Sequence, residues 1–100
     1  MENAQRNNQE KVKLSLIDLS ALEDCAKVLD FGAKKYSRDN WQKGLVLTEI
    51  LDSMLRHIAD LRNGEYIDIE SGLPHIGHIQ ANSMFLGGKN NIIDITFDKK

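Results

Sequence analysis

All three histidines of the chain lie within one stretch near its middle, His57, His75 and His78. His75 and His78 are three residues apart and Asn82 follows four residues later, so these side chains share one face if the segment is a helix. His57 comes three residues after Met54, on the apolar side of a second helical pattern, and so should point inward. If the two helices pair in antiparallel fashion, we expect the three imidazoles to converge on one pocket.

The connection between these two patterns is acidic and contains Asp68 and Glu70. Imidazole together with carboxylate suits a divalent transition metal, and it also suits acid–base catalysis near neutral pH. We predict His75, His78 and Glu70 as metal ligands, and Glu70, Asp68 and His57 as catalytic groups. A second interpretation stays open, in which a histidine–carboxylate network only fixes the connecting loop.

A second group of residues could bind a nucleotide. Lysines at the end of a helical pattern supply charge for phosphates, and the aromatic residues beside them can stack on a base. The predicted ligand-binding residues are Lys34, Lys35, Tyr36, Asn40, Trp41, Arg56 and Asn82. The alternative is a solvated lysine pair favoured by the helix dipole, beside a buried tryptophan. The sequence contains no P-loop, dinucleotide-binding glycine fingerprint or nucleophile elbow.

Three helices should position these groups. The first opens at Ser20, whose spacing from Glu23 is that of a capping box, and runs to Tyr36 with an interruption at Gly32. Such a glycine marks either a close approach to the backbone or a plain helix–helix contact. The second helix should cover 48–61, with Thr48 as its N-cap, and the third should cover 74–86.

The ends of the chain are expected to be different in character. Residues 1–10 are polar and predict a flexible tail, and residues 11–19 predict an extended arm lying on the domain. Near the other end, Ile93, Ile95 and Phe97 alternate with polar residues. This alternation predicts a short strand that pairs with a partner chain or with the N-terminal arm.

Composition limits the remaining choices. One hundred residues, 41% of them hydrophobic, form one small domain, here expected over 11–100. A core of this size gains from packing against another subunit, so a homo-oligomer is expected. The net charge of −2 argues against a nucleic-acid surface. There is no membrane-spanning run or secretory signal, and the single Cys25 fits a reducing cytoplasm.

Two strings in the sequence resemble a known family. FGAKKYSRDNW and LRHIADLRNGEYIDIESGLPHIGHIQAN are similar to the phage and prophage family called dATP/dGTP diphosphohydrolase, N-terminal domain, over about residues 16–86. That family is related to the all-α NTP pyrophosphohydrolases. The resemblance implies a small, oligomeric, all-α bundle of three main helices in the host cytoplasm. It also implies that a purine nucleotide binds between the helices, where carboxylates hold Mg²⁺ or Mn²⁺ and activated water releases pyrophosphate.

The chain departs from the related enzymes at the metal site. Those enzymes use Glu-x-x-Glu and Glu-x-x-Asp pairs, whereas this chain has Arg56-His57 and His75-x-x-His78, and its third helix carries no acidic residue. Mg²⁺ prefers oxygen ligands, which imidazoles replace poorly. The metal could therefore sit on acidic residues elsewhere, a different ion could be used, or hydrolysis could be absent. The candidate acidic residues are Asp52, Glu65, Asp68 and Glu70.

Three functions remain open at this point, and two of them involve a nucleotide. One is metal-dependent cleavage of a purine (d)NTP to (d)NMP and pyrophosphate. The other is a non-catalytic sponge, needing no metal, which sequesters a cyclic-nucleotide or ADP-ribose-type immune signal in phage counter-defence. A purely structural helical partner protein is a third possibility.

Overall fold

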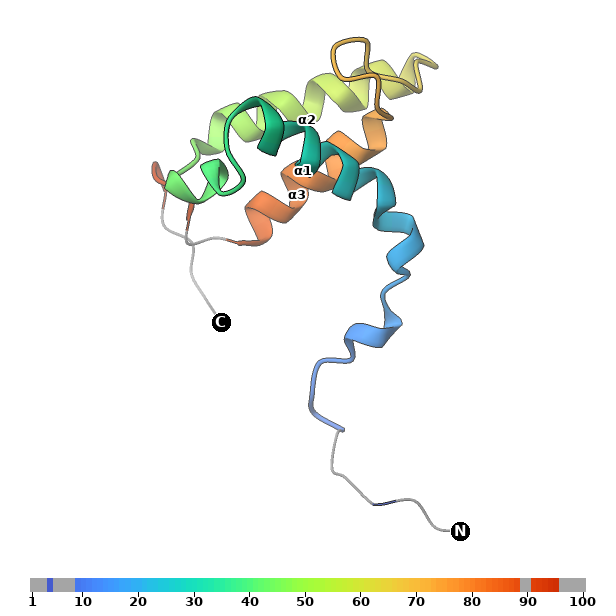
Figure 1. Ribbon diagram of the computed structural model, residues 1–100, viewed down its shortest axis with the longest axis vertical. Helices are drawn as coiled ribbons and strands as arrows, with labels where there is room; N and C mark the ends of the chain where they lie inside the picture. Colours follow the sequence, from blue (N-terminus) through green and yellow to red (C-terminus); the bar gives the residue numbers. More distant parts are fainter. Residues whose placement is uncertain (1–3, 5–8, 89–90, 96–100) are drawn as a thin grey trace.

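The computed structural model describes residue 4 and residues 9–88 and 91–95. Three α-helices form its body: α1 (Glu23–Lys35), α2 (Leu47–Arg62) and α3 (His75–Gly87) (Figure 1). Three short 3₁₀ helices complete the regular structure of these residues: η1 (Leu14–Leu16), η2 (Leu19–Leu22) and η3 (Asn40–Lys43). Isolated bridges occur in the described part of the chain, but no strand does. The predicted all-α fold with three main helices is confirmed.

Helix α3 is the centre of the bundle and packs against both α1 and α2. Its contact with α1 depends on Gly77, because a Cβ at this position would lie 2.6 Å from the backbone oxygen of Asp24. The apolar core beside this contact consists of Cys25, Val28 and Ala81, with Leu29 and Leu73 packed against it. Only a residue without a side chain lets the two backbones come this close.

The start of α1 differs from the prediction. Asp18, rather than Ser20, provides the cap, since its carboxylate accepts hydrogen bonds from the backbone N–H and the hydroxyl of Ser20 at 3.0 and 2.6 Å. This cap opens η2, and α1 then begins at Glu23 without a side-chain cap of its own. The predicted capping box is therefore wrong, because Ser20 lies inside η2 and Leu22 occupies the N-cap position of α1.

Gly32 does not interrupt α1, which runs through it to Lys35. A Cβ built at this position would meet nothing within 4 Å. The residue therefore marks neither a close backbone approach nor a helix–helix contact. It lies on the wall of an open pocket instead.

The start of α2 is capped by a residue from the far end of the chain. Asp94 accepts a hydrogen bond from the backbone N–H of Leu47 at 2.8 Å. Val46, and not the predicted Thr48, occupies the N-cap position and forms no side-chain cap. A carboxylate at this position also interacts favourably with the positive end of the helix dipole.

Asp94 reaches α2 because the segment before it pairs with the residues that lead into the helix. Leu45 donates to the carbonyl of Asn91 at 2.7 Å and accepts from Ile93 at 2.9 Å, which makes a single parallel bridge. Gly44 permits this approach, since its φ is 120° and a Cβ there would clash with Ile93. The predicted strand pairing with another chain or with the N-terminal arm is thus replaced by an intrachain bridge, and Phe97 lies outside the described residues.

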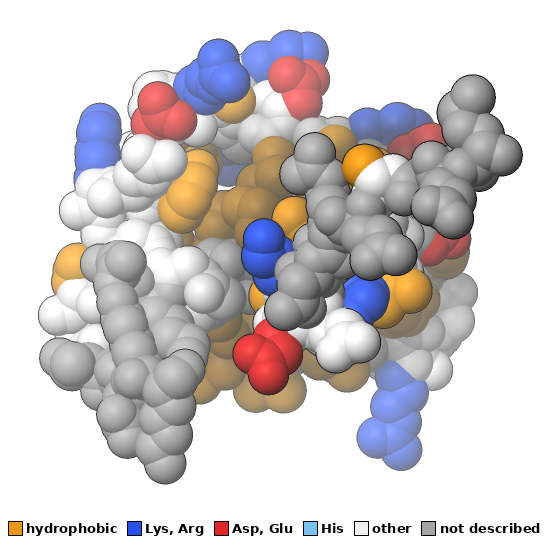
Figure 2. All heavy atoms as spheres, turned by 90° about the horizontal axis from the view of Figure 1, so that it is seen from below, with side chains coloured by type: hydrophobic (Ala, Val, Ile, Leu, Met, Phe, Trp, Pro, Cys, Tyr) orange, Lys and Arg blue, Asp and Glu red, His pale blue; other side chains and the backbone are white. Residues whose placement is uncertain are grey.

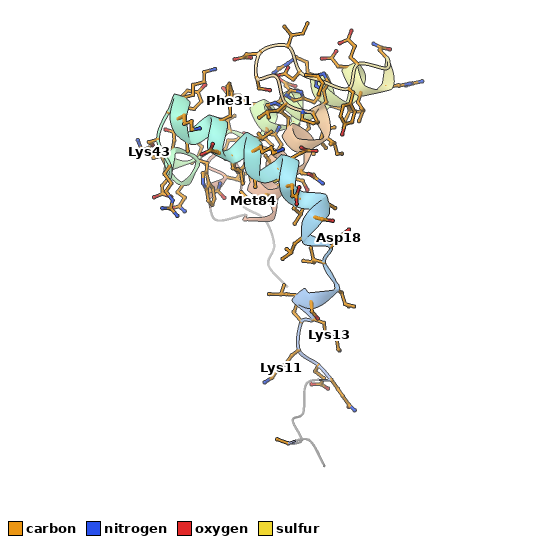
Figure 3. All side chains as sticks on the ribbon, turned by 45° about the vertical axis from the view of Figure 1, so that its right-hand side comes forward. Lys11, Lys13, Asp18, Phe31, Lys43 and Met84 are labelled. Carbon is orange, nitrogen blue, oxygen red and sulfur yellow. The ribbon has the colours of Figure 1, made fainter. Side chains whose placement is uncertain are left out.

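Residues 9–17 stand away from the helical body instead of lying on it, whereas η2 touches α3 through the hydrogen bond from the Gln80 amide to the Ala21 carbonyl at 2.9 Å. Figure 3 shows Lys11 and Lys13 along this segment, at a distance from Phe31 and Met84 in the bundle. The radius of gyration is 16.9 Å, whereas a compact chain of this length has about 13 Å.

Few hydrophobic side chains are buried in the described part of the chain. Among these residues the buried ones are Cys25, Val28, Ile50, Ala81 and Ile92. Many large apolar side chains remain exposed, and on the face shown in Figure 2 hydrophobic side chains gather in the middle with charged ones around them. None of the described helices is long and apolar enough to cross a membrane.

Candidate functional site

Helices α2 and α3 run antiparallel, and their facing side chains form the site. Paired residues step in opposite directions along the two helices: Asp60 with His75, His57 with His78, and Ser53 with Asn82. The connecting loop closes through hydrogen bonds from Asp68 to Leu73 and from His75 to Tyr66. The reversal of direction brings the acidic loop beside the first turn of α3.

The three imidazoles meet at this junction. The Nδ1 atoms of His57 and His75 are 2.8 Å apart, so one ring donates a hydrogen bond to the other. The His57 ring also stacks face to face on His78, with centroids 4.3 Å apart and planes 6° apart. His75 is only 1% exposed. Buried polar groups need partners, and these rings satisfy that need largely among themselves.

Asp68 and Ser71 connect the loop to α3. The Ser71 backbone N–H and hydroxyl lie 2.9 and 2.8 Å from Oδ2 of Asp68. The same hydroxyl is 2.7 Å from Nε2 of His78. Since the hydroxyl has one proton to donate, donation to the carboxylate requires that His78 donates from Nε2 to Ser71. The loop is thereby fixed to α3.

Burial and hydrogen bonding set the protonation states of these groups. Burial lowers the pKa of the His57 imidazole, and the neighbouring His78 lowers it further. Burial also lowers the pKa of His78. Burial acts to raise the pKa of Asp68, but the hydrogen bonds from Ser71 outweigh this and bring it below its usual value. Neutral imidazoles and an ionised carboxylate are the forms that bind metal ions.

A pocket of about 1000 Å³ opens beside this cluster, between the three helices and the turn that follows α1. This volume lies at the upper end of ordinary small-molecule sites. One part of its wall is aromatic and includes Tyr36, with Trp41 stacked on Phe85 at 5.6 Å between centroids. Another part is polar and includes His57 and Asp68. The pocket therefore presents stacking surfaces and ionisable groups to the same ligand.

The structure separates the two adjacent lysines. Lys35 lies on the pocket wall and forms an ion pair with Glu70 at 2.9 Å, which raises the pKa of Lys35. Lys34 does not line the pocket and pairs instead with Asp30 at 3.0 Å. Arg56 of α2 also lines the pocket.

Most of the residues singled out from the sequence come together around this pocket. Those that line it are His57, Asp68, Glu70, His78, Lys35, Tyr36, Asn40, Trp41, Arg56 and Asn82. Lys34 lies outside the wall, and His75 lies behind it in contact with His57.

Two groups of described residues could each hold a metal ion, because within each group the ligand atoms lie within 4.8 Å of one another. One consists of His57, Asp68 and His75, and the other of Asp60, Glu65 and His75. Neither group includes Glu70, whose carboxylate faces Lys35. The donor atoms are of mixed type, imidazole nitrogen and carboxylate oxygen, which suits transition metals better than Mg²⁺.

Sequence reasoning did not single out Asp60, Ser71 or Phe85, all of which belong to this site. Asp60 lies three residues after His57 and shares its helix face, so helical spacing could have identified it. Ser71 follows Asp68 by three residues, which is typical of a side chain that closes a turn. The stacking of Phe85 on Trp41 joins distant segments, and no local pattern indicates it.

Comparison with known proteins identifies relatives of this chain. A phage protein named dATP/dGTP diphosphohydrolase, from Salmonella phage PMBT28, is 42% identical over 79 residues. The aligned region covers 79% of this chain and 27% of the relative, so the chain spans about a quarter of that protein's length. No solved structure matches the chain.

The match to a family is broader still. A profile described as dATP/dGTP diphosphohydrolase, N-terminal, matches residues 1–96. This range includes all three helices, the acidic loop and every residue of the pocket wall. The chain therefore belongs to the dATP/dGTP diphosphohydrolase N-terminal family.

Proposed function

We propose that this protein binds a purine deoxynucleoside triphosphate and cleaves it to the monophosphate and pyrophosphate. The observation that carries the proposal is the pocket that joins aromatic side chains to the histidine–carboxylate cluster. Support for the substrate class comes from the relative in Salmonella phage PMBT28, which is named for dATP and dGTP. Since the chain spans about a quarter of that relative, its own activity needs a direct test.

The pocket suggests how the nucleotide is oriented. The base stacks on the aromatic part of the wall, at Tyr36 and Trp41, because aromatic faces bind any base without strict selectivity. The phosphates then extend towards Lys35 and Arg56, which neutralise their charge. Asn40 and Asn82 offer amide groups along the same wall.

The cleavage step needs a proton acceptor near the α-phosphorus. Water oxygen forms a bond to this phosphorus, the bond to the bridging oxygen breaks, and pyrophosphate leaves with the bond's electron pair. Glu70 is positioned to take the proton from water, since Lys35 exchanges its carboxylate for the phosphates when a nucleotide binds. The histidine–carboxylate cluster would hold a divalent ion, which would supply additional positive charge for the phosphates.

The test of cleavage is incubation of the purified protein with dGTP or dATP and Mn²⁺ or Mg²⁺, with products separated by ion-exchange chromatography. The expected products are the monophosphate and pyrophosphate in equal amounts. Bound nucleotide recovered intact would contradict cleavage and would instead support the sponge. Release of inorganic phosphate alone would contradict the proposed bond cleavage.

The adjacent lysines provide a matched pair for the binding step. Lys35→Ala should weaken dGTP binding about 10-fold, because it removes a charge from the pocket wall. Lys34→Ala should leave the affinity unchanged, since Lys34 lies off the wall and pairs with Asp30. Equal effects of the two substitutions in a calorimetric titration would contradict this placement of the phosphates.

A further inference from the structure

The contact between His57 and His75 has a feature that simple packing does not require. Their Nδ1 atoms face each other at 2.8 Å in the interior, with His75 1% exposed. Each neutral imidazole carries one N–H, so one proton occupies the space between the two nitrogens. Without that proton, both nitrogen lone pairs can be turned towards one metal ion that lies beside the line joining the two nitrogens.

The separation of the two nitrogens fits a metal ion once the rings turn towards it. Bonds from metal to imidazole nitrogen are about 2.1 Å, so two adjacent ligands of an octahedral ion lie about 3.0 Å apart. The observed 2.8 Å needs to open by only a few tenths of an ångström, and both rings must turn so that their nitrogens point at the ion instead of at each other. Ligand atoms of His57, His75 and Asp68 already lie within 4.8 Å of one another.

Hydrogen bonds from Ser71 orient the carboxylate of Asp68, the third ligand. The hydrogen bonds described for the Asp68 side chain all reach Oδ2, from the backbone and hydroxyl of Ser71. Oδ1 is left for another interaction. Such support of a ligating carboxylate fixes its orientation and is typical of metal sites.

We propose that His57, His75 and Asp68 bind one transition-metal ion of the Mn²⁺, Co²⁺ or Zn²⁺ class. Two imidazoles and one carboxylate favour these ions over Mg²⁺, which prefers oxygen ligands. The role of this ion in catalysis rests on the proposed function, since the ion would lie beside the pocket that would hold the phosphates. Metal binding itself is measured without any nucleotide.

Binding requires one change of tautomer and no net change of charge. Nε2 of His75 lies 3.8 Å from a carboxylate oxygen of Asp60, which favours a proton on Nε2 and leaves Nδ1 of His75 as an acceptor. His57 then carries its proton on Nδ1. When the ion enters, His57 gives this proton to solvent and takes one up at Nε2, so that both Nδ1 lone pairs face the metal.

This ligand set differs from the one predicted from spacing alone. His78 is engaged through Nε2 with Ser71 at 2.7 Å, and its ring stacks on His57. Glu70 is engaged with Lys35. The proposal therefore assigns His78 and Glu70 to the surroundings of the ion and not to its ligands.

The test uses Co²⁺ alone as the probe, with calorimetry for affinity and visible absorption for the ligand type. Wild-type protein should bind one equivalent of Co²⁺ with absorption bands typical of nitrogen ligation, and Mg²⁺ should bind at least 10-fold more weakly. His57→Phe, which keeps a ring on His78, and Asp68→Asn, which keeps an acceptor for Ser71, should each weaken Co²⁺ binding at least 10-fold. Glu70→Gln should bind like wild type.

Circular dichroism of each variant shows whether it is folded. Unchanged Co²⁺ affinity in folded His57→Phe or Asp68→Asn would overturn the proposal, as would a loss of affinity in Glu70→Gln equal to theirs. Failure here is distinct from failure of the proposed function. Cleavage of dGTP by a wild-type protein that binds no Co²⁺ overturns the metal site alone, whereas normal Co²⁺ binding without cleavage contradicts the enzyme and leaves the site standing.

Discussion

At the scale of single residues, Gly77 and Gly32 occupy two helices under opposite constraints. A Cβ on Gly77 would lie 2.6 Å from the Asp24 carbonyl oxygen and 2.8 Å from its carbon, and these backbone atoms cannot move independently. A Cβ on Gly32 would meet nothing within 4 Å. The same substitution should therefore have different consequences at the two positions.

Gly77→Ala should lower the free energy of unfolding by about 1–3 kcal/mol, the usual cost of forcing extra volume into a packed contact. Gly32→Ala should raise it by up to about 1 kcal/mol, because alanine favours the helix. Urea denaturation followed by circular dichroism measures both. A stabilised Gly77→Ala variant would contradict the close contact between α1 and α3.

Cys25 offers a second test at this scale. Burial raises the pKa of its thiol, so the folded protein holds it in the neutral form. Native protein at pH 8 should be alkylated by iodoacetamide far more slowly than protein unfolded in guanidinium chloride. Because the folded state favours the protonated thiol, the stabilisation that this gives is complete at neutral pH. It is lost as the pH rises above about 8.5, where the thiol of the unfolded chain ionises first. Equal alkylation rates in the two states would show that Cys25 is accessible.

At the scale of elements, the helices follow from local patterns but their caps do not. Apolar spacing predicts all three helices to within a few residues, because packing of one apolar stripe determines where a helix exists. The predicted caps at Ser20 and Thr48 are wrong because other residues occupy those roles, Asp18 in the first case and Asp94 in the second. Asp94 is 47 residues away from the N–H that it caps, and no local pattern predicts such a partner.

Asp94→Ala should destabilise the protein by about 0.5–2 kcal/mol, as expected for loss of an N-terminal cap. Asp94→Asn should lose less stability than Asp94→Ala, because the amide oxygen still accepts a hydrogen bond from the Leu47 N–H and only the interaction with the helix dipole is reduced. Thermal denaturation of the three proteins gives the order. If Thr48→Ala costs more than Asp94→Ala, the predicted local cap is the true one.

The site was predictable in part for a similar reason. Spacing places His75, His78 and Asn82 on one helix face and His57 on the inner face of the preceding helix, and an antiparallel pair brings them together. Which nitrogen contacts which partner depends on side-chain positions across helices. The pairing of His57 with His75, and of His78 with Ser71, therefore required the structure.

At the scale of the whole molecule, the described chain leaves many large apolar side chains exposed, and gathered apolar side chains on a surface are a common mark of an interaction site. Val12, Leu14 and Leu16 in the segment before α1 are 85%, 70% and 82% exposed, and Leu55 on α2 is 62% exposed. The buried apolar side chains are few by comparison. We propose that a second copy of this chain covers part of this surface.

Sedimentation velocity should therefore show association that increases with protein concentration. The double substitution Leu14→Asp and Leu16→Asp should shift the equilibrium towards monomer, because it places charge on the exposed apolar segment. Ser15→Asp adds charge at an exposed position between them and should change the equilibrium least. A wild-type protein that stays monomeric at all concentrations would contradict this expectation.

The central claim is that one pocket joins the aromatic wall to the histidine cluster, and nuclear magnetic resonance with dGTP tests it most directly. Trp41 is the single tryptophan, so its indole N–H signal is unambiguous, and the imidazole signals of His57 and His78 report the other end. Both sets of signals should shift with one dissociation constant as dGTP is added. Shifts at one end alone, or different constants at the two ends, would contradict a shared nucleotide pocket.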